Sequence, residues 1–157
     1  MKTKVTLDLV REARKVSDLA SVSYVRQKEA LGLGHAVLAA RDLVANEPFA
    51  VMLPDDLIDA PGKPALRQMI DVFEREGDPV IALLKVAMEE ISAHGVTRGA
   101  RHAGDARLHL LKELVEKPKK EDAPSDLAII GRYILTPDIF DDLVATARDG
   151  SGEIQLT

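Results

Sequence analysis

Two short stretches of this sequence combine the residue types that bind phosphorylated ligands. Residues 32–34 (Gly-Leu-Gly) form a glycine turn that opens a helix, where free backbone N–H groups and the positive end of the helix dipole can meet a phosphate. Asp55 and Asp56 directly follow the apolar run of residues 49–53. A carboxylate at the end of a buried strand can hold Mg²⁺ against nucleotide phosphates, so these stretches predict a phosphate and metal site.

Each of these stretches also has a purely structural explanation. The glycine turn lacks the Lys of a P-loop and the third Gly of a dinucleotide fingerprint, so taken alone it favours a tight strand-to-helix turn. In an arbitrary Asp-Asp pair, one carboxylate commonly caps a turn and the other is solvated. Glu116 and Lys117 end a further strand, where a solvated ion pair is the usual outcome. No metal-ligand spacing links the histidines, which are His35, His94, His102 and His109.

The elements that must position these residues alternate between strands and helices. Apolar residues at helical spacing predict helices over residues 6–18, 36–44 and 66–73 and after Pro137. Short apolar or alternating runs predict strands over residues 21–27, 49–53, 80–86, 108–117 and 127–135. This alternation predicts an α/β layered fold with a mostly parallel central sheet.

Finer expectations follow from single residues. Residues 49–53 are continuously apolar, which is typical of a strand covered on both faces. Thr136 is expected to cap the last helix, with Pro137 at its first position. The buried face of that helix is expected to contain Ile139, Phe140, Leu143 and Val144. The polar, glycine-containing residues 92–105 are expected to form short strands or loops near a site.

Composition limits the class of protein. The chain has 157 residues, of which 46% are hydrophobic and 30% charged, and it contains no cysteine. These values are typical of one globular domain without disulfides, so we expect a cytoplasmic protein. The net charge of −5 argues against a nucleic-acid polymer as partner. No apolar run approaches the ~20 residues of a membrane span, so no membrane association is expected.

Several ordered blocks resemble the bacterial UTP–glucose-1-phosphate uridylyltransferases. They are residues 24–36 (YVRQKEALGLGHA), 48–56 (PFAVMLPDD), 115–118 (VEKP), 123–137 (APSDLAIIGRYILTP) and 152–157 (GEIQLT). The resemblance implies a Rossmann-like nucleotide-diphospho-sugar transferase fold, with residues 1–157 as one partial domain. It also implies UTP and glucose 1-phosphate as substrates, Mg²⁺ as cofactor, and a homo-oligomer in the full-length form.

On the nucleotide side, the resemblance implies that Gln27 and the backbone amide of Gly32 read the uracil edge. A Gln amide can donate and accept hydrogen bonds, as recognition of uracil requires. The resemblance makes Asp55 the magnesium ligand and a catalytic residue. Asp56 points elsewhere if the chain remains extended there.

On the sugar side, the resemblance implies that the backbone of Gly95 contacts the sugar and that Glu116 accepts hydrogen bonds from its hydroxyl groups. Lys117 is expected to bind the sugar phosphate as a catalytic residue. His94 stands where the family has Tyr, which places any contact of that side chain in question. Arg132 is expected near the edge of the site.

The implied reaction is nucleotidyl transfer, in which a sugar phosphate oxygen attacks the α-phosphorus of UTP in line and pyrophosphate leaves. The sequence contains no copy of the G-x-G-T-R loop or the P-x-T-K motif that grips the triphosphate in this family. The chain therefore resembles an internal fragment of such an enzyme, incomplete at both ends, and is expected to have little activity alone. The alternatives are a related thymidylyl- or cytidylyltransferase, or a non-catalytic module that binds nucleotide or a partner.

Overall fold

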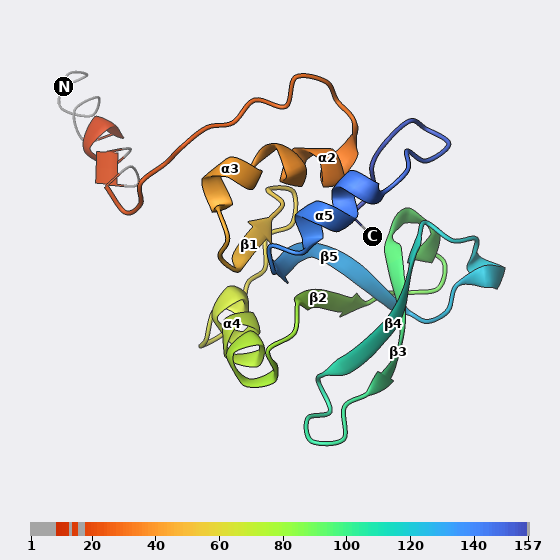
Figure 1. Ribbon diagram of the computed structural model, residues 1–157. Coiled ribbons are helices and arrows are strands. Elements are labelled where there is room, and N and C mark those ends of the chain that lie inside the picture. Colours follow the sequence, from red (N-terminus) through yellow and green to blue (C-terminus); the bar gives the residue numbers. More distant parts are fainter. Residues whose placement is uncertain (1–8, 13, 16–17, 157) are drawn as a thin grey trace.

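A computed structural model describes residues 9–12, 14–15 and 18–156 (Figure 1). Its helices are α2 (Gly32–Ala39), α3 (Arg41–Val44), α4 (Ala65–Glu76) and α5 (Ile139–Ala145), with short 3₁₀ turns at Ile91–Ala93 and Lys120–Asp122. Its strands are β1 (Phe49–Met52), β2 (Val80–Lys85), β3 (Gly95–Arg101), β4 (His109–Glu116) and β5 (Leu127–Leu135). The α/β content agrees with the sequence-based prediction.

The sheet is antiparallel, and the prediction of a mostly parallel sheet is wrong. Its order is β1-β5-β3-β4, and β2 pairs with β5 as well. Both β1 and β2 run antiparallel to β5. The unit β1–α4–β2 therefore does give two strands of the same direction, as its sequence pattern implies, but β5 lies between them. The strand–helix–strand sequence pattern predicts that β1 and β2 run in the same direction, but it does not predict which strand lies next to each of them.

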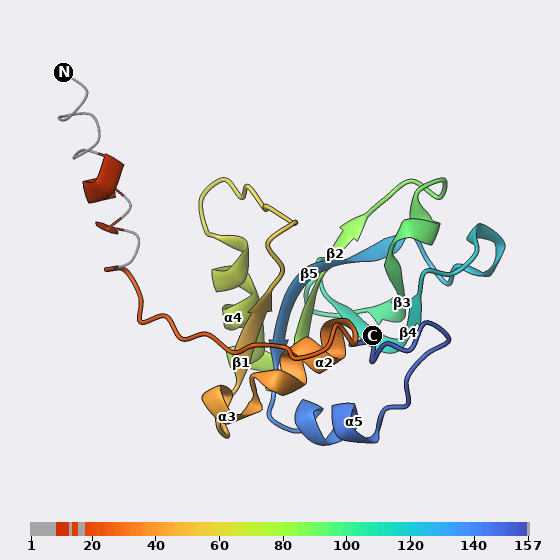
Figure 2. The ribbon, with the colours of Figure 1, turned by 90° about the horizontal axis from the view of Figure 1, so that it is seen from above.

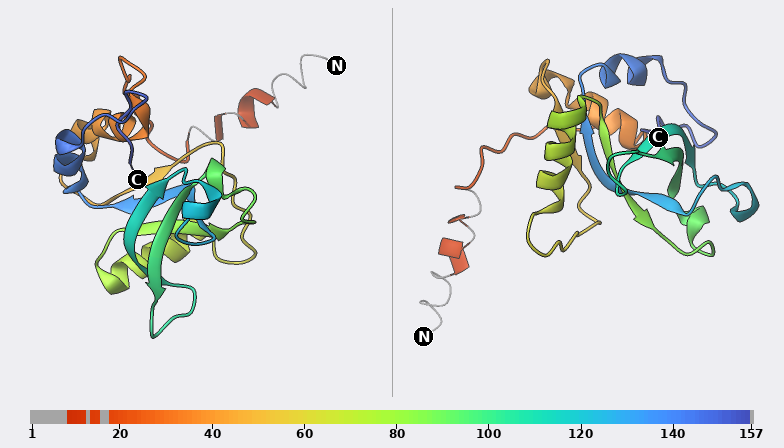
Figure 3. Two further views of the ribbon diagram at one scale, coloured as in Figure 1. Left: turned by 90° about the vertical axis from the view of Figure 1, so that its right-hand side faces the viewer. Right: turned by 90° about the horizontal axis from the view of Figure 1, so that it is seen from below.

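Strand β5 is the centre of the molecule, and helices cover both of its faces (Figures 1 and 2). Its residues from Gly131 to Leu135 are all buried. Alternate side chains along a strand point to opposite faces, so Tyr133 and Leu135 share one face. That face packs against α2 and α5, while α4 packs against β2 and β5. The β3–β4 hairpin extends from the N-terminal end of β5, where Val96 of β3 pairs with Ala128 (Figure 3).

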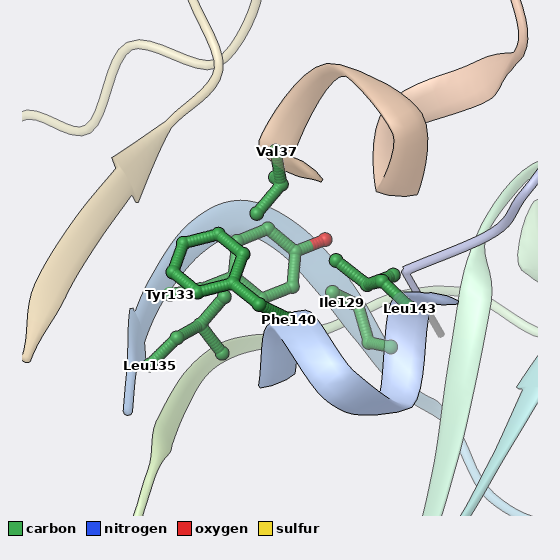
Figure 4. Close-up of a cluster of buried hydrophobic side chains, with 6 residues drawn as sticks. All are labelled: Val37, Ile129, Tyr133, Leu135, Phe140 and Leu143. Carbon is green, nitrogen blue, oxygen red and sulfur yellow. The ribbon is translucent and has the colours of Figure 1, made fainter. Parts of the chain in front are cut away.

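The hydrophobic core lies between α2, α5 and β5 (Figure 4). Figure 4 shows its buried side chains converging from these three elements, which are Val37, Ile129, Tyr133, Leu135, Phe140 and Leu143. The ring of Phe140 stacks on Phe49 of β1 with a centroid distance of 5.3 Å. Removing a buried Phe side chain commonly costs ~3–5 kcal/mol, so this stack is a main support of the core.

Several local expectations need correction. Residues 21–27 are extended but form no strand, because no other described strand pairs with them; Tyr24 there is 92% exposed. Strand β1 is covered on one face only, since its alternate residue Met52 is 55% exposed. The first helix, expected over residues 6–18, lies partly outside the described residues, and those described at 9–12 and 14–15 are helical.

The last helix also begins differently from the prediction. Its N-cap is Asp138, and no side chain caps it, so the expected Thr136 cap is wrong. The carbonyl of Thr136 instead accepts a bond from Ile139 N–H at 3.2 Å. Val144 is exposed, unlike the buried Phe140 and Leu143, because α5 covers the sheet with a narrow face. Within the described part of the chain, no helix is both long and apolar enough to span a bilayer.

Candidate functional site

The glycine turn is packed against the C-terminal segment of the chain. Gly34 N–H donates to the carbonyl of Ile154 at 2.9 Å, and Ile154 N–H donates to Leu31 O at 2.8 Å. A Cβ built on Gly34 would lie 2.8 Å from the carbonyl oxygens of Ile154 and Gln155. Gly32 has φ +88°, a left-handed conformation that favours glycine. These glycines therefore allow the start of α2 to approach the backbone of the C-terminal segment closely.

A turn centred on Asp149 holds the C-terminal segment in this position. Its carboxylate accepts hydrogen bonds from the Ser151 hydroxyl, the Gln155 side-chain amide at 2.7 Å and the Glu153 N–H at 3.0 Å. These donors hold the pKa of the Asp149 carboxyl well below its usual value, with the Ser151 hydroxyl contributing most. The turn positions the backbone of Ile154 against Gly34, and the sequence analysis assigned no role to it.

Gln27 contacts the glycine turn through its side-chain amide. Its Nε2 donates to the carbonyl of Gly32 at 3.1 Å and lies 2.9 Å from Nδ1 of His35. All three residues are partly buried. Among the described residues, the backbone N–H of Gly32, the first residue of α2, has no hydrogen-bond partner. The pair Gln27 and Gly32 therefore forms one cluster of hydrogen-bonding groups at the start of α2.

The two aspartates after β1 differ in their surroundings. Asp55 is exposed, and its carboxylate makes no hydrogen bond or ion pair with any described residue. The Asp56 carboxylate instead accepts from the backbone N–H of Gly131 on β5 at 3.0 Å. Mg²⁺ usually binds one or two carboxylates together with phosphate and water oxygens. Asp55 fits that role as a single ligand, whereas one oxygen of Asp56 is already bonded to the protein.

Arg132 connects the same loop to β5. Its guanidinium donates to the carbonyl of Leu53 at 2.6 Å and also to the carbonyl of Asp56. The residue is only 7% exposed, so these carbonyls replace water around its charge. Together with the bond from Gly131 to Asp56, Arg132 fixes the start of the loop that carries Asp55. The expectation that Arg132 lies at the edge of the site stays a prediction, and the sequence did not indicate this bracing role.

Gly95, Glu116 and Lys117 meet at one end of the β3–β4 hairpin. Gly95 pairs with Glu116 in the ladder, and Lys117 N–H donates to the carbonyl of His94 at 3.1 Å. The ammonium of Lys117 is 3.8 Å from a Glu116 oxygen, and its side chain is 64% exposed. Lys117 has φ +42°, so the backbone turns sharply there. This turn breaks the strand alternation that would send the two side chains to opposite faces.

Tyr133 of β5 is a buried core residue, and nothing in the sequence pattern pointed to an electrostatic role for its hydroxyl group. Burial raises the pKa of its hydroxyl, and the negative charges of Glu116 and Asp56 raise it further. In the apolar pattern of β5, Tyr133 resembles any other core residue, so nothing in the sequence distinguished it.

The structure joins the predicted residues into two clusters and does not link them all. Gln27 contacts Gly32, and Glu116 contacts both Gly95 and Lys117. No hydrogen bond or ion pair between described residues connects Asp55 to either cluster. No group of three or more His, Asp or Glu side chains able to hold a metal ion occurs among the described residues.

A cavity of about 850 Å³ lies elsewhere, and none of the predicted site residues line it. It separates α4 from β2 and β4 and has a mostly apolar lining, which includes Met69, Ile81, Leu83, Leu111, Leu114 and Ile130. Its charged lining is mixed in sign, with Arg107 and Lys112 beside Glu76, Asp78 and Glu113. Because these carboxylates would repel a nucleotide phosphate, we do not assign the nucleotide to it.

The sequence of this chain is similar to that of known sugar-nucleotide-forming enzymes. UTP–glucose-1-phosphate uridylyltransferase 2 of Staphylococcus saprophyticus is 43% identical over 157 residues, which cover 100% of this chain and 53% of that protein. The UTP–glucose-1-phosphate uridylyltransferase YngB of Bacillus subtilis is 41% identical, with 100% and 52% covered. The chain thus spans about half the length of the curated relatives it matches.

Solved structures give the same relationship. A UDP-glucose pyrophosphorylase complexed with UDP-glucose has a TM-score of 0.81 and 48% identity, over 86% of this chain and 51% of the other. A UTP-bound enzyme of this kind from Acinetobacter baumannii has a TM-score of 0.77 and 32% identity, over 97% and 56% of the two chains. The profile of the nucleotidyl transferase family matches residues 3–156. The chain therefore belongs to the nucleotidyl transferase family.

Proposed function

We propose that this chain is part of a uridylyltransferase that forms UDP-glucose and pyrophosphate from UTP and glucose 1-phosphate. The observation that carries the proposal is the contact between Gln27 and Gly32 at the start of α2. It leaves the amide oxygen of Gln27 and the backbone N–H of Gly32 without partners among the described residues, which suits the N3–H and a carbonyl of uracil. The similarity to uridylyltransferases over the whole chain supports this assignment.

The proposed reaction needs no protein nucleophile. An oxygen of the sugar phosphate attacks the α-phosphorus of UTP, the bond to the β-phosphate breaks, and pyrophosphate carries away the electron pair. Asp55 would hold Mg²⁺, which would supply charge neutralisation to the nucleotide phosphates. Lys117 holds the sugar phosphate in line, while Glu116 and the Gly95 backbone orient the sugar. The exposed Lys117 ammonium and the sharp turn at that residue support this placement.

The proposal includes the setting of the enzyme. We expect it to act in the cytoplasm, as a homo-oligomer in its full-length form, on small molecules and not on a nucleic acid or a membrane. We also expect the 157 residues alone to turn over slowly, since the sequence has no G-x-G-T-R loop. Losing even one donor that stabilises transition-state charge commonly costs ~10²–10³ in rate.

The test is a titration of the 157-residue chain with UDP-glucose, with and without Mg²⁺, in which nuclear magnetic resonance detects binding. We expect saturable shifts at the backbone amide of Gly32 that weaken in Gln27→Ala. The gain in affinity with Mg²⁺ should be lost in Asp55→Asn and kept in Asp59→Asn, a matched control in the same exposed loop. An affinity for UDP-glucose that is unchanged in both Gln27→Ala and Asp55→Asn would overturn the proposal. Turnover to UDP-glucose at an ordinary enzyme rate would overturn the expected low activity.

A further inference from the structure

The orientation of the Gln27 side-chain amide is fixed by its neighbours. Nε2 is 3.1 Å from the carbonyl oxygen of Gly32, and a carbonyl can only accept a hydrogen bond. The flipped amide would place Oε1 against that oxygen and bring two acceptors together. Nε2 of Gln27 must therefore face the turn and donate to Gly32.

The same nitrogen lies 2.9 Å from Nδ1 of His35, one helical turn beyond Gly32 on α2. An amide nitrogen has no lone pair available to accept a hydrogen bond, so His35 must be the acceptor. Its Nδ1 is then unprotonated, and the neutral ring carries its proton on Nε2. Gln27 thus uses one amide hydrogen on Gly32 and the other on His35.

This arrangement leaves Gln27 with only one free group, the acceptor Oε1. An acceptor at this position matches the N3–H of uracil. Cytosine in the same position presents an unprotonated ring nitrogen, which would face Oε1 as a second acceptor. Without the bond to His35, one amide hydrogen of Gln27 is free and the side chain can swing or rotate to offer a donor instead.

We propose that His35 is a positioning residue that holds Gln27 as a hydrogen-bond acceptor and so sets the preference of the site for uracil over cytosine. The inference rests on the proposed function, because it assumes that the base meets Gln27. It also makes a statement that needs no ligand, namely that His35 is the Nε2–H tautomer and Gln27 donates both amide hydrogens.

The test compares two substitutions of His35 in the full 157-residue chain. His35→Asn keeps an acceptor, Oδ1, close to the place of Nδ1, whereas His35→Leu removes it. With UMP and CMP as probes, we expect the ratio of their dissociation constants to fall about tenfold toward unity in His35→Leu, the effect of one lost hydrogen bond. His35→Asn should restore most of the ratio. His109→Leu, a partly buried histidine on β4, serves as the control.

A double substitution separates positioning from a general loss of structure. In a Gln27→Ala background, His35→Leu should change the UMP to CMP ratio no further, because the residue it positions is gone. An independent, additive effect would overturn the proposal, and so would an unchanged ratio in a folded His35→Leu variant.

Long-range proton–nitrogen correlation spectra of the unliganded protein provide the second readout. They should show His35 with its proton on Nε2, and a proton on Nδ1 of the neutral ring would overturn the proposal. If the spectra agree but neither nucleotide binds, the proposed function fails, and with it the role of His35 in base selection. If both nucleotides bind and substitution of His35 leaves the ratio of their dissociation constants unchanged, only the positioning role fails.

Discussion

The backbone N–H of Gly34 donates a hydrogen bond to the carbonyl oxygen of Ile154 across 2.9 Å, so the start of α2 and the end of the described chain lie side by side. Both segments belong to the blocks that resemble uridylyltransferases. The contact explains why a glycine is needed at position 34 without any reference to a ligand. It also means that the geometry of Gln27 and His35 depends on how firmly the C-terminal segment is held.

Gly34→Ala should therefore loosen this contact. The added Cβ would lie 2.8 Å from the Ile154 and Gln155 carbonyl oxygens and from a methyl group of Leu143. Such overpacking commonly costs ~1–3 kcal/mol of the free energy of unfolding. Gly150→Ala is the matched control, because a Cβ there meets nothing within 4 Å. Urea denaturation of both variants checks this. Equal free energies of unfolding would show that the structure can accommodate a Cβ at position 34 without loss.

The two neighbouring aspartates should separate into a structural and a functional residue. Asp56→Ala leaves the Gly131 N–H without its carboxylate partner, which commonly costs ~1–3 kcal/mol for a partly buried group. Asp55→Ala removes an exposed side chain and should change stability by less than about 0.5 kcal/mol. Denaturant unfolding of the two variants checks the difference. A larger loss for Asp55→Ala would mean that its carboxylate has a structural partner.

The sequence pattern was sufficient for most individual elements of the fold. Helix α4 has a clear apolar face that includes the buried Met69, and it ends at Gly77, which has φ +80°. The bounds of β5 agree with prediction because residues 127–135 are mostly apolar, and seven of the nine are buried. Pairing was not predictable, because the insertion of β5 between β1 and β2 depends on contacts between residues far apart in the chain. For the same reason, the extended residues 21–27 could not be distinguished from a paired strand.

For the candidate site too, the sequence predicted some features and could not predict others. The position after an apolar strand made Asp55 a candidate, whereas Gln27 and Lys117 were implied by the resemblance to uridylyltransferases. Gln27 contacts the glycine turn in the structure. The sequence could not show that the Asp56 carboxylate is engaged by β5, since that bond joins segments far apart in the chain. Nor could it show that Tyr133, which sits in an apolar strand, senses two carboxylates.

Two substitutions of Lys117 should separate its charge from its backbone conformation. Its φ of +42° strains any residue with a Cβ, by ~1–3 kcal/mol in typical cases. Lys117→Gly should relieve that strain and leave stability unchanged or higher by about 1 kcal/mol, after the entropy of the unfolded glycine is counted. Lys117→Met keeps the strain. Both remove the ammonium, so both should weaken glucose 1-phosphate binding about tenfold while leaving UMP binding unchanged, as titrations can measure.

The ionisation of Tyr133 gives a direct measure of the charges around the site. The chain has two tyrosines and no tryptophan, so in Tyr24→Phe the phenolate absorbance reports Tyr133 alone. Its pKa should lie above the ordinary value of 10.0, first because the phenol is buried and then because Glu116 and Asp56 are negative. The native state therefore keeps the proton at pH values where the unfolded chain loses it. The resulting stabilisation is fully present below pH ~10 and is lost as the pH rises through the pKa of the folded state.

Adding Glu116→Gln removes one of these charges and should lower the pKa of Tyr133 toward its ordinary value, although burial keeps it raised. Glu113→Gln is the control, since Glu113 lies on the same strand but pairs with Arg98 at 3.2 Å and does not contribute to the shift at Tyr133. A pH titration of absorbance on the three proteins makes the comparison. If Glu116→Gln leaves the pKa of Tyr133 unchanged while Glu113→Gln lowers it, then Glu116 does not face the phenol. The cluster of Gly95, Glu116 and Lys117 must then be placed farther from β5.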